Sequence, residues 1–272
     1  MSDLETILYE KRGHTALITL NRPDRLNAFN DVMMRELTEA YADIAGDEEI
    51  RSIVLTASGR AFCSGVDLTG GRRAAPAEGE KPRHWKPMGP AYRDPSHHLS
   101  PKGQRLYKPY IVAVNGICAG GGFYFLQEAD IPICSDQASF TEPHTSNGLA
   151  ACVEMVGLRW RIPVAWTMRM ALMGKYERLS PPQALMAGLV TEIVPHEQLL
   201  DRALAIAEIV NRNAPVANIA AVETMWRSMD MPREAALDFA YTMAIYHNAM
   251  SEDNKEGPRA FLEKREPHWT GR

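Results

Sequence analysis

The chain has 272 residues, of which 45% are hydrophobic and 24% are charged. This is the composition of a folded globular protein with one large or two small domains, and it argues against a disordered chain, a collagen-like fibre or a coiled coil. Thirty basic residues against 34 acidic residues leave a formal charge of −4. Because a nucleic-acid binder normally carries a basic excess, we expect no nucleic-acid partner.

No segment of the sequence predicts export or membrane insertion. The first eleven residues mix acids, bases and single apolar residues, unlike a signal peptide. The longest apolar stretch, 110–126, is interrupted by Asn115 and several glycines, so it is a poor membrane span. We therefore expect a cytoplasmic protein without a membrane partner.

The first half of the chain alternates strand-like and helix-like patterns. The strands that this pattern predicts are 15–20, 52–57, 110–114 and 131–134, and a helix is predicted over 30–45. Such an alternation is typical of βαβ units and places the chain in the α/β class. After residue 195 the apolar spacing indicates helices only, which would cover either the core or a neighbouring subunit.

The segment 69–103 is rich in proline and glycine and is predicted to lie outside the core, as a functional lid or a disordered insert. It carries several basic residues, which are Arg72, Arg73, Lys81, Arg83, His84, Lys86 and Arg93. These side chains would reach a polyphosphate or would be ordinary solvated charges.

The four cysteines form no CxxC pair and have no zinc-site spacing, so we expect no metal site. They are Cys63, Cys118, Cys134 and Cys152. Their apolar surroundings predict buried, reduced thiols.

Two glycine-containing turns are the most informative features of the sequence. In the stretch AVNGICAGGGFY, which ends at Tyr124, three adjacent glycines follow a predicted strand and precede a helical segment. Glycines there let backbone N–H groups approach a negatively charged ligand. A second turn, FCSGVDL, holds Ser64 and Gly65. Together the turns could direct two N–H groups at one oxygen, as an oxyanion hole requires, or they are simply tight turns.

At these residues the chain resembles the crotonase (enoyl-CoA hydratase/isomerase) superfamily. The motifs that match it, in order, are Asn21-Arg22-Pro23, Asn27-Ala28, the stretch 59–68 (GRAFCSGVDL), Lys108-Pro109, 113–116 (AVNG) with the glycine triplet, 140–143 (FTEP), Gly148-Leu149 and the tail 251–272. They span nearly the whole chain outside the insert.

The resemblance implies a ββα spiral core over residues 1–195, followed by a helical region over 196–272 that forms a homotrimer or a dimer of trimers. It implies an acyl-CoA thioester substrate, with neither a metal nor a redox cofactor. The oxyanion-hole amides would belong to Ser64 and Gly121. The resemblance implies a CoA groove lined by Arg25, Asn27, Ala28, Ser64, Gly65 and Asp67, with Phe261 and Lys264 touching the adenine from a neighbouring subunit.

The chain departs from the hydratases of this family where they carry two catalytic glutamates. Those two positions hold Tyr124 and His144. A phenol has a reference pKa of about 10 and an imidazole of about 6.5, so His144 is the better acid or base at neutral pH. We expect Glu154 to orient it. The alternatives are that His144 is a structural histidine and that Tyr124 only lines the pocket.

Three functions remain open from the sequence. The first is an acyl-CoA enzyme that stabilises a thioester enolate and catalyses hydration, double-bond migration or a related step. The second is a carbon–carbon bond hydrolase of the same superfamily, in which a histidine activates water for β-diketone cleavage. The third is a catalytically silent acyl-CoA binder.

Overall fold

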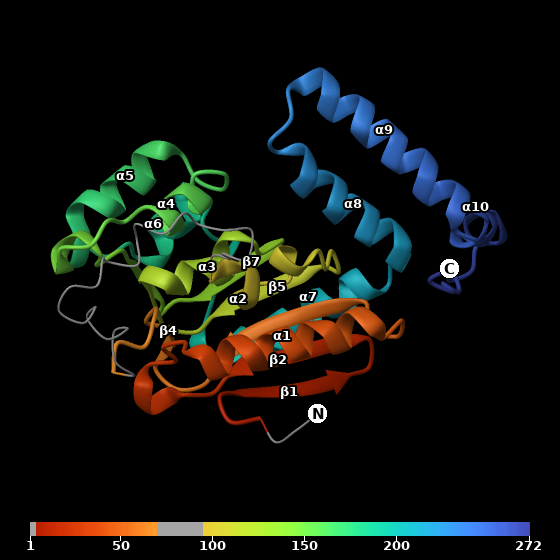
Figure 1. Cartoon of the computed structure of the whole chain (residues 1–272). Helices are drawn as coiled ribbons and strands as arrows, with labels where there is room; N and C mark the ends of the chain where they lie inside the picture. Colours follow the sequence, from red (N-terminus) through yellow and green to blue (C-terminus); the bar gives the residue numbers. More distant parts are fainter. Residues whose placement is uncertain (1–3, 70–94) are drawn as a thin grey trace, which may run out of the picture.

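The computed structural model describes residues 4–69 and 95–272 as a mixed α/β structure (Figure 1). Its strands are β1 (Ile7–Arg12), β2 (Thr15–Leu20), β3 (Ser52–Ala57), β4 (Ala61–Cys63), β5 (Tyr110–Val114), β6 (Ile117–Ala119), β7 (Ile131–Ser135), β8 (Ser139–Thr141) and β9 (Glu192–Val194). Its α-helices are α1 (Asp31–Gly46), α2 (Ser96–Leu99), α3 (Phe123–Gln127), α4 (Val153–Leu158), α5 (Val164–Met173), α6 (Pro181–Ala187), α7 (Leu199–Asn211), α8 (Pro215–Ser228), α9 (Arg233–Met250) and α10 (Asp253–Glu263).

The larger sheet has six strands in the order β1-β2-β3-β5-β7-β9. Only β1 and β2 pair in antiparallel fashion, through a turn at Gly13, and the other neighbours are parallel. Every residue of β3 and of β5 is buried, as expected for parallel strands covered on both faces. The four strands predicted from apolar runs are therefore confirmed, as is the α/β class.

The smaller sheet has three parallel strands in the order β4-β6-β8. Each of its strands follows a strand of the larger sheet within a few residues, since β4 follows β3, β6 follows β5 and β8 follows β7. A helical segment then follows each of the strands β6 and β8. The chain thus winds as a ββα spiral, which confirms the fold implied by the resemblance.

The larger sheet separates two hydrophobic clusters. Alternate residues of β2 divide between them, with Ile18 in the cluster that includes α1 and Leu17 in the cluster that includes α7. In the second cluster, Ala203 and Ile206 of α7 pack with Val54 and Ile111. Helix α7 therefore covers the core, although the predicted division at residue 195 groups it with the helical region.

Helices α8 and α9, drawn in blue in Figure 1, extend away from the sheets. No residue of α9 is buried, and Leu237, Tyr241 and Ile245 are at least half exposed. Helix α8 is attached to the core through Trp226, whose Nε1–H donates a 2.6 Å hydrogen bond to Asp130. The outer part of this hairpin thus exposes apolar side chains in the single chain.

Two sequence predictions need correction. Residues 95–103 do not stay outside the core, because Leu99 is fully buried in the main cluster and the Lys102 ammonium pairs with Asp130 at 2.8 Å. The seven basic residues named for the insert, from Arg72 to Arg93, lie outside the described residues. Cys63, Cys118 and Cys134 are buried free thiols as predicted, but Cys152 is exposed, because it lies in the turn before α4.

Within residues 4–69 and 95–272, no helix combines the length and the apolar character needed to cross a bilayer.

Candidate active site

The turn after β4 lies directly against the glycine triplet. Gly65 has a φ of +97°, and a Cβ atom there would lie 3.1 Å from the Gly121 nitrogen and 3.2 Å from the Ala119 oxygen. Only glycine therefore fits without strain or displacement of backbone. The two turns that the sequence singled out are neighbours in space.

The Ser64 amide is not available to a ligand. Its N–H donates a 3.1 Å hydrogen bond to the Leu26 carbonyl oxygen. The expectation that Ser64 supplies an oxyanion-hole donor therefore needs correction, because this donor is already paired inside the protein.

Val66 has the free amide that Ser64 lacks. The Phe29 N–H donates to the Gly65 carbonyl at 2.9 Å, and the Asp67 N–H donates to the Phe29 carbonyl at 2.8 Å. Because successive N–H groups of an extended chain point to opposite sides, the Val66 N–H is directed away from Phe29. Among the described residues the Val66 N–H has no hydrogen-bond acceptor, and Gly121 lies in the first turn of the short 3-10 helix Gly120–Gly122, where a backbone N–H has no partner within the helix. Sequence reasoning missed Val66, although it lies in the same motif.

His144 lies beside the glycine triplet, at the carboxyl end of β8. A Cβ atom on Gly120 would be 3.3 Å from the His144 Cε1 atom. Strands β6 and β8 are parallel neighbours, so the residues that follow them meet at one sheet edge. The structure thus brings His144 and Gly121 together, as the sequence predicted for the site.

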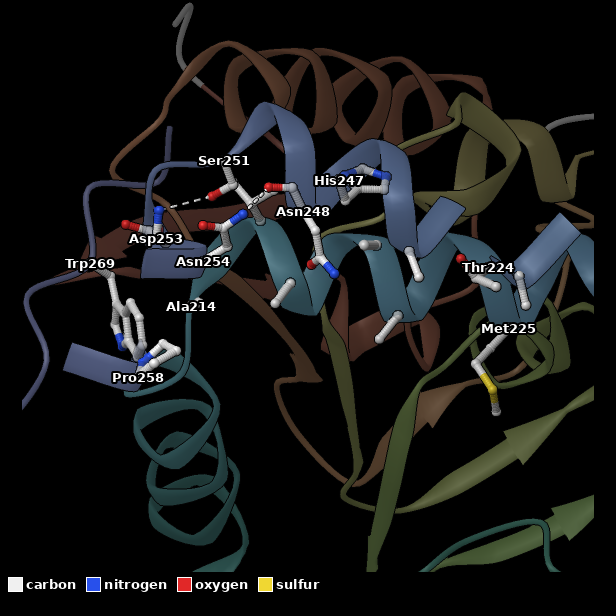
Figure 2. A pocket seen from close by; sticks show the side chains of 16 residues that line it. Ala214, Thr224, Met225, His247, Asn248, Ser251, Asp253, Asn254, Pro258 and Trp269 are labelled. Carbon is white, nitrogen blue, oxygen red and sulfur yellow. Dashed lines mark hydrogen bonds between the residues drawn. The ribbon is translucent and has the colours of Figure 1, made fainter. Parts of the chain in front are cut away.

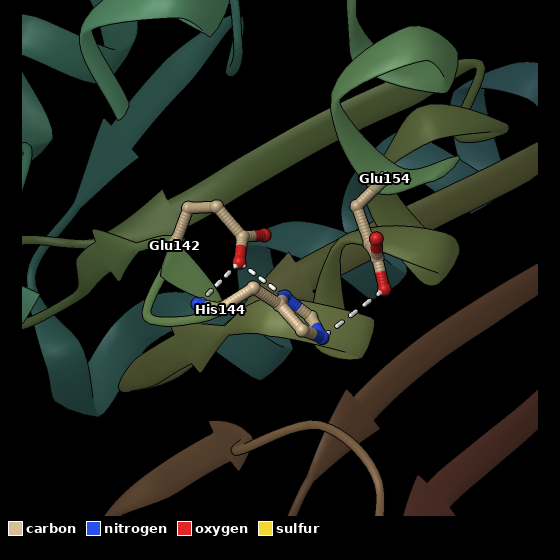
Figure 3. A group of neighbouring side chains, drawn as sticks. All are labelled: Glu142, His144 and Glu154. Atoms are coloured by element: carbon tan, nitrogen blue, oxygen red, sulfur yellow. Dashed lines mark hydrogen bonds and ion pairs between the residues drawn. The ribbon is translucent and has the colours of Figure 1, made fainter. Parts of the chain in front are cut away.

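Two carboxylates flank the His144 ring, as Figure 3 shows. The fully buried Glu142 accepts a 3.0 Å hydrogen bond from the His144 backbone N–H, and its Oε1 is also hydrogen-bonded to Nδ1 of the ring. Glu154, in the first turn of α4, places its Oε1 3.9 Å from Nε2. The expected orienter, Glu154, therefore faces the other ring nitrogen. Sequence reasoning missed Glu142, although it is part of the FTEP motif and two residues from the histidine.

The hydrogen bond that the His144 ring donates to Glu142 raises the pKa of His144 above its ordinary value, and the charges of Glu142 and Glu154 add to this effect. Partial burial of the ring opposes it. An ionised carboxylate only accepts hydrogen bonds, so Nδ1 carries a proton in this contact. The arrangement leaves Nε2 as the nitrogen that can exchange a proton with a ligand.

Glu142, His144 and Glu154 place possible metal-ligand atoms within 4.8 Å of one another. The imidazole ring lies between the two carboxylates (Figure 3). An ion bound at Nε2 would therefore meet Glu154 but not Glu142, which makes two protein ligands where a structural zinc site has four. This geometry suits proton transfer better than metal binding.

Tyr124 lies in α3 with its ring against the same turn. A Cβ atom on Gly121 would lie 2.6 Å from the Phe29 ring and 3.3 Å from Tyr124 Cε2, and the two rings meet edge to face at 6.3 Å. Tyr124 is 5% exposed. It is therefore packed beside Gly121 with almost no solvent exposure.

Several residues expected in the CoA groove organise the loop instead of exposing polar groups. The side chain of the buried Asn27 accepts from the Arg22 N–H and donates to the Ser58 and Ala61 carbonyls at 2.7–2.8 Å. Asp67 forms a 2.8 Å ion pair with Arg22, and hydrogen bonds from Thr69, together with this pairing, lower the pKa of its carboxyl group.

The other expected groove residues differ in exposure and position. Arg25 is exposed, and Ala28 is buried with its carbonyl bonded to Arg22. Phe261 and Lys264, on and just after α10, are exposed and lie far from β4 (Figure 1). In one chain they do not meet the glycine triplet.

Figure 2 shows a separate hollow of about 480 Å³ between α8, α9 and α10. It is lined by alanines of α8 and α9, with His247 and Trp269 among the larger side chains. None of the residues that surround His144 lines it. The hollow is therefore separate from the cluster of Glu142, His144 and Glu154.

Comparison with known proteins identifies the family of the chain. The family model described as Enoyl-CoA hydratase/isomerase matches residues 10–272. The chain is 33% identical to an enoyl-CoA hydratase of Mycobacterium tuberculosis, with 97% of this chain and 96% of that protein covered. It is 34% identical to the carnitinyl-CoA dehydratase of Escherichia coli strain K12, with 98% and 99% covered.

A crystal structure of an enoyl-CoA hydratase/isomerase from Mycobacterium paratuberculosis is similar to this one with a TM-score of 0.86 and 41% identity. The alignment covers 99% of this chain and all of the other. The match therefore extends over the spiral and the C-terminal helices together. The chain belongs to the enoyl-CoA hydratase/isomerase family.

Proposed function

We propose that the protein binds an acyl-CoA thioester, holds the thioester oxygen at the N–H groups of Val66 and Gly121, and uses His144 for proton transfer. An enolate formed next to the thioester places negative charge on that oxygen, and two oriented dipoles stabilise it. The reaction is hydration, dehydration or double-bond migration. The observation that carries the proposal is an imidazole that lies beside the glycine triplet, with its Nδ1 held by Glu142 and its Nε2 facing Glu154 at 3.9 Å.

The size of the effect makes the proposal testable. Removing one oxyanion-hole donor typically costs about 3 kcal/mol in the barrier, or about a hundredfold in rate. General acid–base catalysis by one side chain contributes a further factor of about 10²–10⁴. We propose that no metal and no redox cofactor takes part, because proton transfer and a polarised carbonyl suffice for these reactions.

The assembly and the CoA groove are proposals too. We propose a homotrimer or a dimer of trimers in the cytoplasm, in which the exposed apolar side chains of α9 are covered by a neighbouring copy. Phe261 and Lys264 would then reach the adenine from that neighbour. Light scattering of the purified chain should give a mass three or six times 30.3 kDa.

Binding of a non-hydrolysable butyryl-CoA analogue by calorimetry, together with turnover of crotonyl-CoA, separates the possible functions. Binding with turnover that His144→Ala abolishes is expected. Tight binding without turnover of any thioester would instead indicate an acyl-CoA binder. Cleavage of a cyclic β-diketone without CoA binding would indicate a hydrolase, an alternative favoured by the pairing of His144 with a buried carboxylate.

A further inference from the structure

Glu142 is a buried carboxylate whose position the proposed function leaves unexplained. Its side chain is 0% exposed, and its Oε1 serves both the backbone N–H and Nδ1 of His144. Its Oε2 has no hydrogen-bond partner among the described residues. An unpaired, buried carboxylate oxygen is unfavourable for folding. A neutral glutamine would fit the same space. We therefore expect the negative charge of Glu142 to have a role in the site.

The opposite edge of the ring faces a gap that suits one oxygen atom. Nε2 and the Glu154 Oε1 are 3.9 Å apart, which is too long for a direct hydrogen bond. An oxygen placed about 2.8 Å from both atoms would make a Nε2···O···Oε1 angle of about 90°. Half of that angle is about 44°, because its sine is half of 3.9 Å divided by 2.8 Å. A water molecule or a hydroxyl group can accept this geometry.

The surroundings of the ring restrict which groups can influence it. Glu142 approaches from the end of β8 and Glu154 from α4, and both charges act on His144. Cys118 of β6 lies near Glu142, and burial holds the pKa of its thiol well above the ordinary value. His144 is therefore the group between these elements that changes charge near neutral pH.

We propose that Glu142 is a positioning residue that keeps a proton on Nδ1 of His144, and that Nε2 and the Glu154 carboxyl group hold the oxygen that is added to or removed from the β-carbon of an acyl thioester. This inference rests on the proposed function and narrows it to hydration and dehydration.

Glu154 and His144 can carry all of the protons that move during dehydration. The Glu154 carboxylate takes the proton from Cα of a 3-hydroxyacyl thioester, and the electron pair forms the enolate. Nε2–H then gives its proton to the β-hydroxyl group, the C–O bond breaks, the enolate electrons form the Cα=Cβ bond and water leaves. A proton passes from Glu154 through a water molecule to Nε2 and restores both groups. Hydration is the same sequence in reverse.

Glu142→Gln tests the positioning role, because glutamine keeps the shape and removes the charge. In the wild-type protein, ¹⁵N shifts should show neutral His144 protonated on Nδ1 and a titration midpoint above the ordinary value. In the variant the midpoint should fall, the pH profile of crotonyl-CoA hydration should move in the same direction, and kcat should drop by about 10²–10⁴. An unchanged midpoint and tautomer would overturn the positioning role.

Glu36→Gln provides a matched control. Glu36 is also a buried carboxylate, 3% exposed, and it accepts hydrogen bonds from the backbone N–H groups of Glu5 and Thr6. Its loss should lower the melting temperature but leave the His144 titration and the pH profile unchanged. A shift of the profile in this variant as large as in Glu142→Gln would contradict a specific effect.

Exchange of the α-proton of 3-hydroxybutyryl-CoA in heavy water separates the roles of the two proton carriers. Glu154→Gln should lose this exchange by at least about a hundredfold. His144→Gln should keep exchange but lose elimination of water. The reverse pattern would overturn the assignment of the two groups. If the wild-type protein neither binds nor converts any CoA thioester, the proposed function fails, and the tautomer of His144 still tests Glu142 by itself.

Discussion

Gly65→Ala tests how the two turns are held together. A Cβ atom at this position would lie 3.1 Å from the Gly121 nitrogen and 3.2 Å from the Ala119 oxygen, both of which are backbone atoms. The contact is shorter than ordinary packing allows, so one backbone segment must move by a few tenths of an ångström. The φ of +97° adds strain for any residue with a side chain.

The two effects give a predicted magnitude. Backbone strain costs about 1–2 kcal/mol and overpacking about 1–3 kcal/mol. We expect a total near 3 kcal/mol, which lowers the melting temperature by roughly 6–12 °C in a chain of this size. Because the Gly121 nitrogen belongs to an amide that we propose as an oxyanion-hole donor, kcat/KM for crotonyl-CoA should fall by about a hundredfold.

Gly13→Ala separates strain from contact. Gly13 also has a positive φ, +56°, but nothing lies within 4 Å of a Cβ atom there. The control should lose about 1–2 kcal/mol of stability and no activity. Both variants are compared by thermal melting and by steady-state kinetics well below either melting temperature. If Gly65→Ala loses no more stability than Gly13→Ala and keeps the wild-type kcat/KM, the two turns do not form one site.

Three further predictions concern single residues. Asn27→Ala should destabilise the chain by about 2–4 kcal/mol in urea unfolding, because it leaves the Arg22 N–H and the Ser58 and Ala61 carbonyls unpaired; a loss under 1 kcal/mol would contradict this role. The raised pKa of His144 contributes stability that is complete below about pH 6.5 and is lost as the pH rises through the folded-state pKa. The wild type should therefore exceed His144→Gln in stability by more at pH 6 than at pH 9. The opposite trend would refute the direction of this pKa shift. Cys152 should be the one thiol of four that reacts rapidly with a maleimide in the native protein, since the other three are buried; mass spectrometry that finds rapid labelling of Cys118 would contradict the packing.

The long elements of the fold were predictable because local pattern and tertiary environment agree. Strands β2, β3 and β5 are continuous apolar runs buried by the helices on both faces, and the helix over 31–46 keeps one apolar face. Strands β4, β6, β8 and β9 have three residues each. So short a segment shows no periodicity, and its pairing depends on the neighbouring turns of the spiral.

The sequence predicts which residue types form the candidate site. It does not predict which way their N–H groups and side chains point. The sequence identified His144 and the glycine triplet, whereas the choice between Ser64 and Val66 depends on which amide the Leu26 carbonyl already occupies. Likewise, the sequence places carboxylates on both sides of His144 in the chain, and only the structure shows that Glu142 contacts Nδ1 while Glu154 faces Nε2.

A crystal structure with a bound, non-reactive acyl-CoA tests the central claim most directly. The thioester oxygen should lie about 2.7–3.1 Å from the Val66 and Gly121 nitrogens, with Nε2 of His144 directed towards the β-carbon. A ligand whose carbonyl oxygen contacts neither amide, or a Val66 N–H turned towards another protein acceptor, would contradict the account.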